Sequence, residues 1–270
     1  MRRASLALAF ALSLAGCGNS AEVARVVEPV AAPSTTVAPA PAAPAAPAAP
    51  PTTLPRPEPT FGGLSAESLP AHRTLVAMTV GDTEIYETRQ STEATLTMPH
   101  TTILGTVTVL EVVEGPVDGW ARVRLPMRPN GSEGWVKARD LMLYMVEGKV
   151  EIDLSERTLT YLEDGREILT TSVAVGSQRN PTPEGEFFIT DSVTLDNPTS
   201  PWGPHAFGLS ARSDTITEYN GGDGIIGIHG TNRPGSIGNA ASLGCVRVPN
   251  DVITRLHEMV PIGTPVKITA

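Results

Sequence analysis

The sequence predicts a mostly β chain with one short helix. A long segment that is not expected to pack into a hydrophobic core precedes the folded part. Val, Ile, Leu and Thr alternate with polar residues in several short runs that end at Gly, Pro or Asn-Gly, which is the pattern of half-buried strands and turns. Only residues 251–259 carry apolar side chains at helical spacing. Residues 18–72 are dominated by proline and alanine, so folded β domains are expected only after this segment.

The charge balance narrows the classes of function. The chain has 270 residues, with 20 Lys and Arg against 29 Asp and Glu, and a formal charge of −9. No basic stripe accompanies this acidic balance, which argues against nucleic acid as a partner. The length is sufficient for one large domain or two small ones.

Residues 1–17 have the features of an export signal. A basic start, Met1-Arg2-Arg3, precedes the apolar run Ala4–Leu14, which is too short to span a membrane. The run ends in Leu-Ala-Gly-Cys17, which resembles the bacterial lipobox, where the cysteine is lipidated. The resemblance implies a lipid anchor at Cys17 and an exported protein that faces the cell wall or periplasmic space. An ordinary signal peptide with a chance cysteine is the alternative.

Residues 18–72 are expected to be a tether. Proline at about every third position in the Pro-Ala-Ala stretch excludes a helix. Such a composition favours a stiff, extended, polyproline-like spacer, in which thirty residues reach roughly 90 Å. Featureless disorder is the alternative, and in either case the segment separates an anchor from folded domains.

Residues 73–144 are expected to form a small β domain. Leu75–Val80, Ile85–Tyr86 and Thr101–Val113 are rich in Val, Ile, Tyr and Thr, which favours strands. The next segment predicts a hairpin, because two runs that open with Gly-Trp are separated by a Pro-Asn-Gly turn. These runs are Gly119–Pro126 and Gly134–Lys137.

The two Gly-Trp runs resemble the last strands of the bacterial SH3-like barrel. The resemblance implies a small barrel that recognises wall peptides. A structural spacer explains the motif equally well, because two tryptophans packed in a core need no ligand.

Residues 146–270 are expected to form a larger β domain. Its runs alternate between polar and apolar residues, and one short helix follows the segment that ends at Val248. Residues 191–224 are expected to be loop-rich because they contain three prolines and several glycines. The helix should bury Ile253, Leu256 and Val260, with Asn250 or Asp251 as its N-cap. We expect strands at Lys149–Leu154, Arg157–Leu162, Ile168–Val175, Phe187–Thr190 and Thr264–Thr269.

The segment between Ile225 and Val248 contains the residues most capable of chemistry. It holds Cys245, one of only two cysteines, and His229 sixteen positions earlier (245 − 229). A thiol with a nearby imidazole is the minimal set for a nucleophile and its base. Gly244 lets the backbone approach a reacting carbonyl, so the N–H groups of Gly244 and Cys245 could bind an oxyanion. A buried, unreactive cysteine is the alternative.

These residues match a known signature. His229-Gly230 is followed by Ser242-Leu243-Gly244-Cys245-Val246-Arg247, and Thr182–Phe187 matches an upstream block. Residues 146–270 therefore resemble the L,D-transpeptidase catalytic domain, also called the YkuD domain. Many members carry histidine at the position of Leu243, so the departure affects a donor or water contact beside the cysteine.

The resemblance implies crosslinking of peptidoglycan stem peptides without a cofactor. Cys245 would attack the amide after the third residue of a stem tetrapeptide, expel D-alanine and form a thioester that an amine resolves. His229 would be the base, oriented by the carbonyl of Gly230, and Gly244 would contribute to the oxyanion hole. Carbapenem-type β-lactams would acylate the same sulfur.

Four further residues are candidates for substrate binding, each with a structural alternative. Arg247 could bind a stem carboxylate or fix its loop, and Ser242 could contact substrate or the loop. Trp202 and His205 lie in a proline-rich segment that could cover the cleft, although His205 could equally be a solvated loop residue. A zinc site is not expected, because neither CxxC nor HxxxH spacing occurs.

Three other functions stay open at the level of sequence. The chain could be a catalytically inactive wall-binding lipoprotein, in which the SH3-like domain binds. Alternatively, water or a protein amine could replace the stem amine, which would give an L,D-carboxypeptidase or a protein-to-wall ligase with the same cysteine. The intact Cys–His pair favours an enzyme over the wall-binding protein.

Overall fold

The computed structural model describes residues 65–197, 199–219 and 222–270. The predicted signal, Cys17 and most of the predicted tether lie outside the described residues. The described end of the tether segment is packed: Ala66 and Leu69 contact the core of the small domain, and Glu67 accepts a hydrogen bond from the N–H of Gly115 at 2.9 Å. The packed structure therefore begins several residues before the expected boundary at residue 73.

The small domain is built on a five-stranded antiparallel sheet in the order β6-β5-β4-β1-β7. The predicted hairpin is confirmed, since β5 and β6 pair from Trp120–Lys137 to Arg124–Glu133. The resemblance to an SH3-like barrel stays a prediction. The elements are η1 (Ala66–Ser68), β1 (Thr74–Thr79), β2 (Thr83–Ile85), β3 (Leu96–Met98), β4 (Val109–Val117), β5 (Trp120–Arg124), β6 (Glu133–Lys137), η2 (Ala138–Asp140) and β7 (Leu141–Val146).

One predicted strand of this domain begins later than expected. The sequence predicted a strand over 101–113, but β4 starts at Val109. Residues 102–106 form a turn, in which the N–H of Thr102 donates to the carbonyl of Thr106 at 2.8 Å and Gly105 has a φ of +84°. A turn that needs a left-handed glycine overrides the β preference of its Thr, Ile and Leu neighbours.

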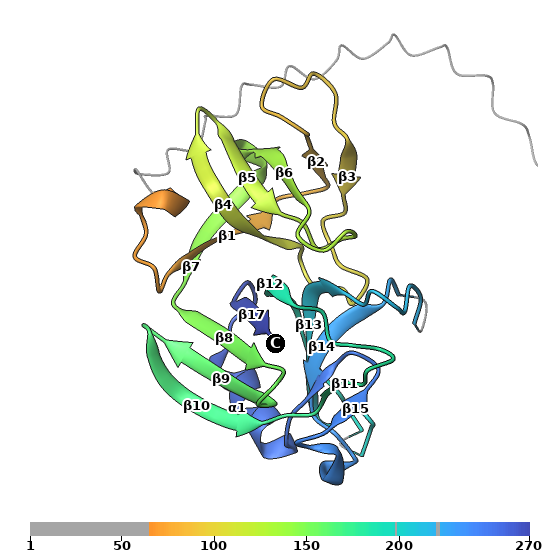
Figure 1. Cartoon of the computed structure of the whole chain (residues 1–270). Helices are drawn as coiled ribbons and strands as arrows, with labels where there is room; N and C mark the ends of the chain where they lie inside the picture. The colour runs from red at the N-terminus through yellow and green to blue at the C-terminus, as the bar shows by residue number, and fades with distance from the viewer. Residues whose placement is uncertain (1–64, 198, 220–221) are drawn as a thin grey trace, which may run out of the picture. The chain divides into compact units, whose positions relative to one another are not determined.

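The larger domain is organised by an eight-stranded sheet in the order β10-β9-β8-β17-β12-β13-β14-β16 (Figure 1). Its first strands form an antiparallel run, and β17 returns from the C-terminus to pair in parallel with β8. The elements are β8 (Gly148–Asp153), β9 (Thr158–Glu163), β10 (Arg166–Ser172), β11 (Val175–Gly176), β12 (Gly185–Thr194), β13 (His205–Arg212), β14 (Ile225–His229), η3 (Pro234–Ser236), β15 (Ala240–Ser242), β16 (Val246–Arg247), α1 (Asn250–Met259) and β17 (Pro265–Thr269).

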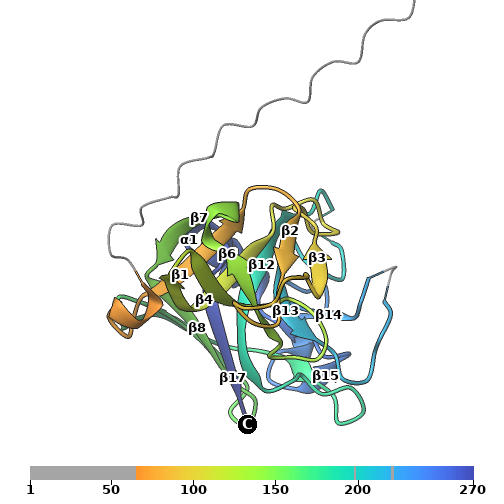
Figure 2. The same cartoon turned by 90° about the horizontal axis from the view of Figure 1, so that it is seen from above.

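Strand β12 joins the two halves of this sheet. Its first residues pair with β17, and its residues from Ile189 to Thr194 pair with β13. The strands β12, β13 and β14 run side by side (Figure 2). This places β14 near the edge of the sheet, where only the short β16 lies beyond it.

The prediction of a loop-rich segment over 191–224 is wrong for much of its length. β12 continues to Thr194, and β13 occupies Arg212 and the seven positions before it. β13 contains no Val, Ile or Thr, but it does contain Gly208, where a Cβ would lie 3.0 Å from a carboxylate oxygen of Asp191. Close approach to β12 requires a small residue here, and that requirement removed the strand signal from the sequence.

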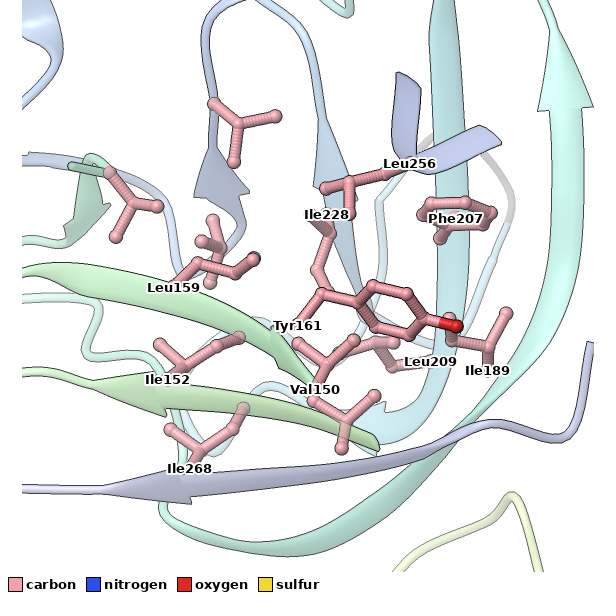
Figure 3. Packing of buried hydrophobic residues seen from close by; sticks show 14 of the residues in the cluster. Val150, Ile152, Leu159, Tyr161, Ile189, Phe207, Leu209, Ile228, Leu256 and Ile268 are labelled. Carbon is pink, nitrogen blue, oxygen red and sulfur yellow. The ribbon is translucent and has the colours of Figure 1, made fainter. Parts of the chain in front are cut away.

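The core of the larger domain lies between this sheet and α1. Tyr161 of β9, Phe207 of β13 and Leu256 of α1 are buried in the same apolar cluster (Figure 3). The predicted helix face is confirmed, since Ile253, Leu256 and Val260 are at most 4% exposed. None of the helices in the described part of the chain is long and apolar enough to cross a membrane.

The predicted N-cap of α1 is wrong. The N-cap is Pro249, which makes no side-chain cap, and Asn250 is the first helical residue. The Asn250 side-chain oxygen instead accepts a hydrogen bond from the backbone N–H of Thr231 at 2.7 Å. The amide is therefore used to hold a neighbouring loop rather than the helix end.

The two domains share a small apolar cluster. Val76, Val109 and Val146 of the small domain and Phe188 of β12 are all buried in it. Beside this cluster the hydroxyl of Tyr144 donates to the carbonyl of Ile262 at 2.9 Å.

Candidate active site

Strands β14 and β16 bring the predicted nucleophile and base to one face. They pair in parallel, with Ile228 opposite Val246 and His229 opposite Arg247. The same register places Gly227 opposite Cys245, which directly precedes β16. Side chains two positions apart share a face of a strand, so His229, Cys245 and Arg247 point to the same side.

His229 is buried, with 5% of its surface exposed. Its Nδ1 lies 2.6 Å from the carbonyl oxygen of Gly230. A carbonyl can only accept, so Nδ1 carries the proton and Nε2 keeps a free lone pair. The ring of Trp202 packs against the imidazole, with 4.5 Å between ring centroids. The imidazole is thus held in the tautomer that a base requires.

The surroundings of His229 keep it uncharged at neutral pH. Burial lowers the pKa of His229 to about 4; the hydrogen bond to Gly230 opposes this shift, and the positive charge of Arg247 adds to it. Above this value the ring is neutral and able to accept a proton.

Cys245 is a free thiol that is partly exposed. Burial of the sulfur raises the pKa of the Cys245 thiol, while a backbone hydrogen bond from Gly227 and the charge of Arg247 act in the opposite direction. At neutral pH the thiol is therefore protonated beside a neutral imidazole. Attack by this sulfur needs proton transfer to the histidine at the moment of reaction.

The loop that carries Cys245 is fixed by two hydroxyl groups. Ser242 donates to the carbonyl of Cys245 at 2.6 Å and accepts from the N–H of Gly244 at 3.0 Å. Thr182 donates to the carbonyl of Gly244 at 2.8 Å and accepts from the N–H of Gly176 at 2.8 Å. The Gly244 N–H is thus already engaged, and it must leave Ser242 if it is to bind an oxyanion.

Gly244 is required at its position for two reasons. Its φ is +119°, a value that side chains rarely allow, and a Cβ would lie 2.9 Å from the side chain of Ile226. The residue before Cys245 therefore has to be glycine whether or not its N–H contacts substrate.

The loop after His229 is held just as closely. Asn250 accepts the N–H of Thr231, and the hydroxyl of Thr231 accepts the N–H of Arg233 at 3.0 Å. Gly203 has a φ of +66°, and a Cβ there would lie 2.6 Å from the Cα of Gly230. The backbone therefore leaves no room for a side chain at residue 203, directly after Trp202.

The pair opens into a cavity of about 100 Å³. His229, Cys245, Ser242, Arg247 and Trp202 all line it, so the structure brings these predicted residues together. Leu243 lies at the rim with 51% of its surface exposed. Part of the wall comes from the connection between β13 and β14: Ser213, Ile216, Tyr219 and Gly224 line the cavity.

His205 is not brought to this cavity. Its ring stacks on that of His257, with 4.1 Å between centroids and 16° between planes, and Nδ1 lies 3.3 Å from the hydroxyl of Thr194. His205 was predicted to lie near the cleft with Trp202 because both belong to a proline-rich segment that could cover it. The intervening turn sends Trp202 toward His229 and His205 into β13.

Thr182 and Asn250 were not predicted as parts of the site. Thr182 lies in the Thr-Pro-Glu-Gly block, so its place in a recognised motif was the only signal. Asn250 was assigned to the helix cap, which its residue type favours. Within the described residues, no group of three His, Cys, Asp or Glu side chains could hold a metal ion.

Comparison with known proteins assigns a family to the larger domain. The family model of the L,D-transpeptidase catalytic domain, YkuD, matches residues 147–268. Two proteins whose names place them among the L,D-transpeptidases are similar to the chain. YkuD of Bacillus licheniformis is 38% identical over 121 residues, which is 45% of this chain and 65% of that protein. YkuD of Bacillus subtilis is 35% identical over 125 residues, which is 46% of this chain and 68% of that protein.

The chain belongs to the YkuD family of L,D-transpeptidases. Its match covers about two thirds of the length of these relatives. Among solved structures, Bdellovibrio bacteriovorus Bd1075 is 27% identical with a TM-score of 0.36, and the match covers 45% of this chain and 47% of that one. The catalytic domain of the Enterococcus faecium L,D-transpeptidase is 25% identical with a TM-score of 0.35, and the match covers 45% of this chain and 95% of that domain.

The neutral Cys–His arrangement of this YkuD domain predicts a distinctive pH profile. The rate at which iodoacetamide alkylates Cys245 should rise with pH in a single step. The pKa of this step should be higher than that of free cysteine, because burial raises the thiol pKa. The measurement is the rate of mass gain of the Cys17→Ala protein between pH 5 and 10. A plateau of high reactivity from about pH 5 to 8, as in a thiolate–imidazolium pair, would contradict the neutral arrangement.

Proposed function

We propose that this YkuD domain is a cysteine-dependent L,D-transpeptidase that crosslinks peptidoglycan stem peptides. One observation carries the proposal: His229 at the end of β14 and Cys245 just before the parallel strand β16 line one cavity, and the imidazole is held with Nε2 free to accept. A nucleophile, its base and an orienting carbonyl are the parts that acyl transfer by a thiol requires.

In the first half-reaction, Cys245 attacks the carbonyl carbon of the amide after the third residue of a stem tetrapeptide. A C–S bond forms as the thiol proton moves to Nε2 of His229. The N–H of Cys245, with that of Gly244 once it is released from Ser242, stabilises the oxyanion. Collapse breaks the C–N bond, and the imidazolium gives its proton to the departing D-alanine.

In the second half-reaction, an amine of another stem attacks the thioester. His229 takes a proton from this amine, the new C–N bond forms, and the C–S bond breaks to release the thiolate, which the imidazolium reprotonates. Gly230 stabilises each imidazolium state through its carbonyl. Arg247 places a cation at the cavity, where it can bind a carboxylate of the stem peptide.

The experiment that tests the function is mass spectrometry of a stem tetrapeptide incubated with the purified protein. We expect loss of D-alanine and a dimer whose new bond starts at the third residue. A shortened peptide without a dimer would indicate an L,D-carboxypeptidase, in which water is the acceptor. An unchanged tetrapeptide would contradict the enzyme and favour a wall-binding protein.

We further propose that the protein is exported and anchored by a lipid on Cys17, with residues 18–64 as the tether and the small domain as a wall-facing module. The lipobox and the proline-rich segment behind it support this proposal. Cys17→Ala should move the protein from the membrane fraction to the soluble fraction, as immunoblotting of the two fractions would measure. Retention of the variant in the membrane fraction would exclude Cys17 as the anchor.

A further inference from the structure

A turn of the small domain forms hydrogen bonds to part of the wall of the cavity that contains Cys245. This turn connects β5 to β6 and contains Arg128 and Asn130. The guanidinium of Arg128 donates to the carbonyl of Ser213 at 2.6 Å and to that of Ile216 at 3.1 Å. Ser213 and Ile216 both line the cavity with the nucleophile.

Asn130 holds the start of the same wall. Its amide nitrogen donates to the carbonyl of Arg212 at 2.8 Å, and its amide oxygen accepts the N–H of Arg212 at 2.8 Å. The Asn130 side chain therefore pairs with the backbone of Arg212 as a neighbouring strand would. The end of β13, where the wall begins, is therefore fixed by the other domain.

An ion pair and close packing also contribute to the contact between the small domain and the cavity wall. Asp223 pairs with Arg128 at 2.8 Å and with Arg212 at 3.2 Å. Gly224, which lines the cavity, has a φ of +55°, and a Cβ there would lie 3.0 Å from the Arg128 guanidinium. Because Asp223 is half exposed, solvent weakens the ion pair, and the bonds to backbone carbonyls do more to fix the wall.

We propose that Arg128 and Asn130 are positioning residues of the transpeptidase site, and that the small domain thereby shapes the cleft that receives the stem peptide. The planar guanidinium reaches Ser213, Ile216 and Asp223 together, which a lysine ammonium cannot do. The consequence for catalysis rests on the proposed function; the consequence for the wall itself does not.

The alternative is that these residues only hold the two domains together. Tyr144 makes a matched control, because Tyr144→Phe also removes an interdomain hydrogen bond, the one to the Ile262 carbonyl at 2.9 Å, without touching the cavity wall. Arg139→Ala controls for loss of an arginine from the small domain, since Arg139 is half exposed and, among the described residues, pairs with the adjacent Asp140 at 3.9 Å.

The experiment compares full-length Arg128→Ala, Arg128→Lys, Asn130→Ala and the two controls. Hydrogen exchange of the peptide covering residues 209–219 reads the wall directly. Kinetics of D-alanine release from a stem tetrapeptide read its effect on substrate, and iodoacetamide alkylation reads the thiol alone. Circular dichroism confirms that each variant is folded.

We expect Arg128→Ala and Asn130→Ala to speed exchange in residues 209–219, while the controls leave it unchanged. Arg128→Ala should raise KM for the tetrapeptide about tenfold, with kcat and the alkylation rate changed far less, because a charged donor to two carbonyls is lost but the thiol and imidazole are not moved. Arg128→Lys should fall between Arg128→Ala and wild type.

Exchange and KM in Arg128→Ala that match those in Tyr144→Phe would overturn the proposal. An equal fall in kcat and alkylation would also overturn it, since the whole site would then have collapsed. A wild-type protein that releases no D-alanine would refute the proposed function instead, and the exchange measurement would still decide whether the turn positions the wall.

Discussion

Cys245→Ala is expected to abolish covalent capture of a carbapenem. A carbapenem presents a strained carbonyl that the Cys245 sulfur can open, and it would be held as a thioester on that sulfur. Intact-protein mass spectrometry should show one drug equivalent on wild type and none on Cys245→Ala. The expected effect is complete, because Cys245 is the one cysteine of the described residues and lies beside the base in the same cavity.

The chain offers a matched control for this result in its other cysteine. Cys17→Ala replaces the other cysteine and should acylate at the wild-type rate. A drug adduct that persists on Cys245→Ala would place the nucleophile elsewhere. Failure of wild type itself to acylate would contradict the active thiol.

His229→Ala is expected to slow carbapenem acylation by about 10²-fold or more, the usual contribution of a positioned base. The thiol is protonated at neutral pH because burial raises its pKa, so without the imidazole nothing nearby accepts the proton. Stopped-flow or mass-resolved acylation rates at pH 7 measure the loss. His205→Ala should stay close to wild type, since His205 stacks on His257 away from the cavity.

The pH dependence separates loss of the base from loss of packing. Because burial lowers the pKa of His229 to about 4, the base is available above that pH and lost as the pH falls through it. Wild-type acylation should therefore show an acid limb near pH 4 that His229→Ala lacks. A His229→Ala protein that keeps this limb would assign it to another group.

Much of the fold was predictable because its signals are local. The β5–β6 hairpin follows from two short β runs and a Pro-Asn-Gly turn, and the buried face of α1 follows from apolar side chains at helical spacing. β13 was missed because its central glycine is required by the close approach of Asp191 on the neighbouring strand. A contact between two strands cannot be read from the local sequence of one of them. The turn at 102–106 was missed because a run of Thr, Ile and Leu concealed a left-handed glycine.

The candidate site divides in the same way. His229, Cys245 and Gly244 were predicted from residue type and spacing, because a thiol, an imidazole and flanking glycines together favour a nucleophile with its base. The role of Gly230 was predicted from the resemblance to the YkuD domain. Their supports were not identified. Thr182 bonds a carbonyl 62 positions away, and Asn250 bonds an N–H 19 positions away. His205 was misplaced because proximity in sequence says little about the direction of a loop.

The sequence by itself determined the family of the catalytic domain, and it predicted the candidate nucleophile and its candidate base. Only the tertiary structure decided how these two side chains are held and what encloses them. In the folded protein the N–H of Gly244 donates to Ser242, and the side chain of Asn250 supports a loop instead of capping the helix. Arg128 of the small domain forms a hydrogen bond to the cavity wall. The physical reason is the sequence separation of the contacts. Patterns along the chain reflect contacts between residues a few positions apart, whereas the site is completed by segments that meet only after folding.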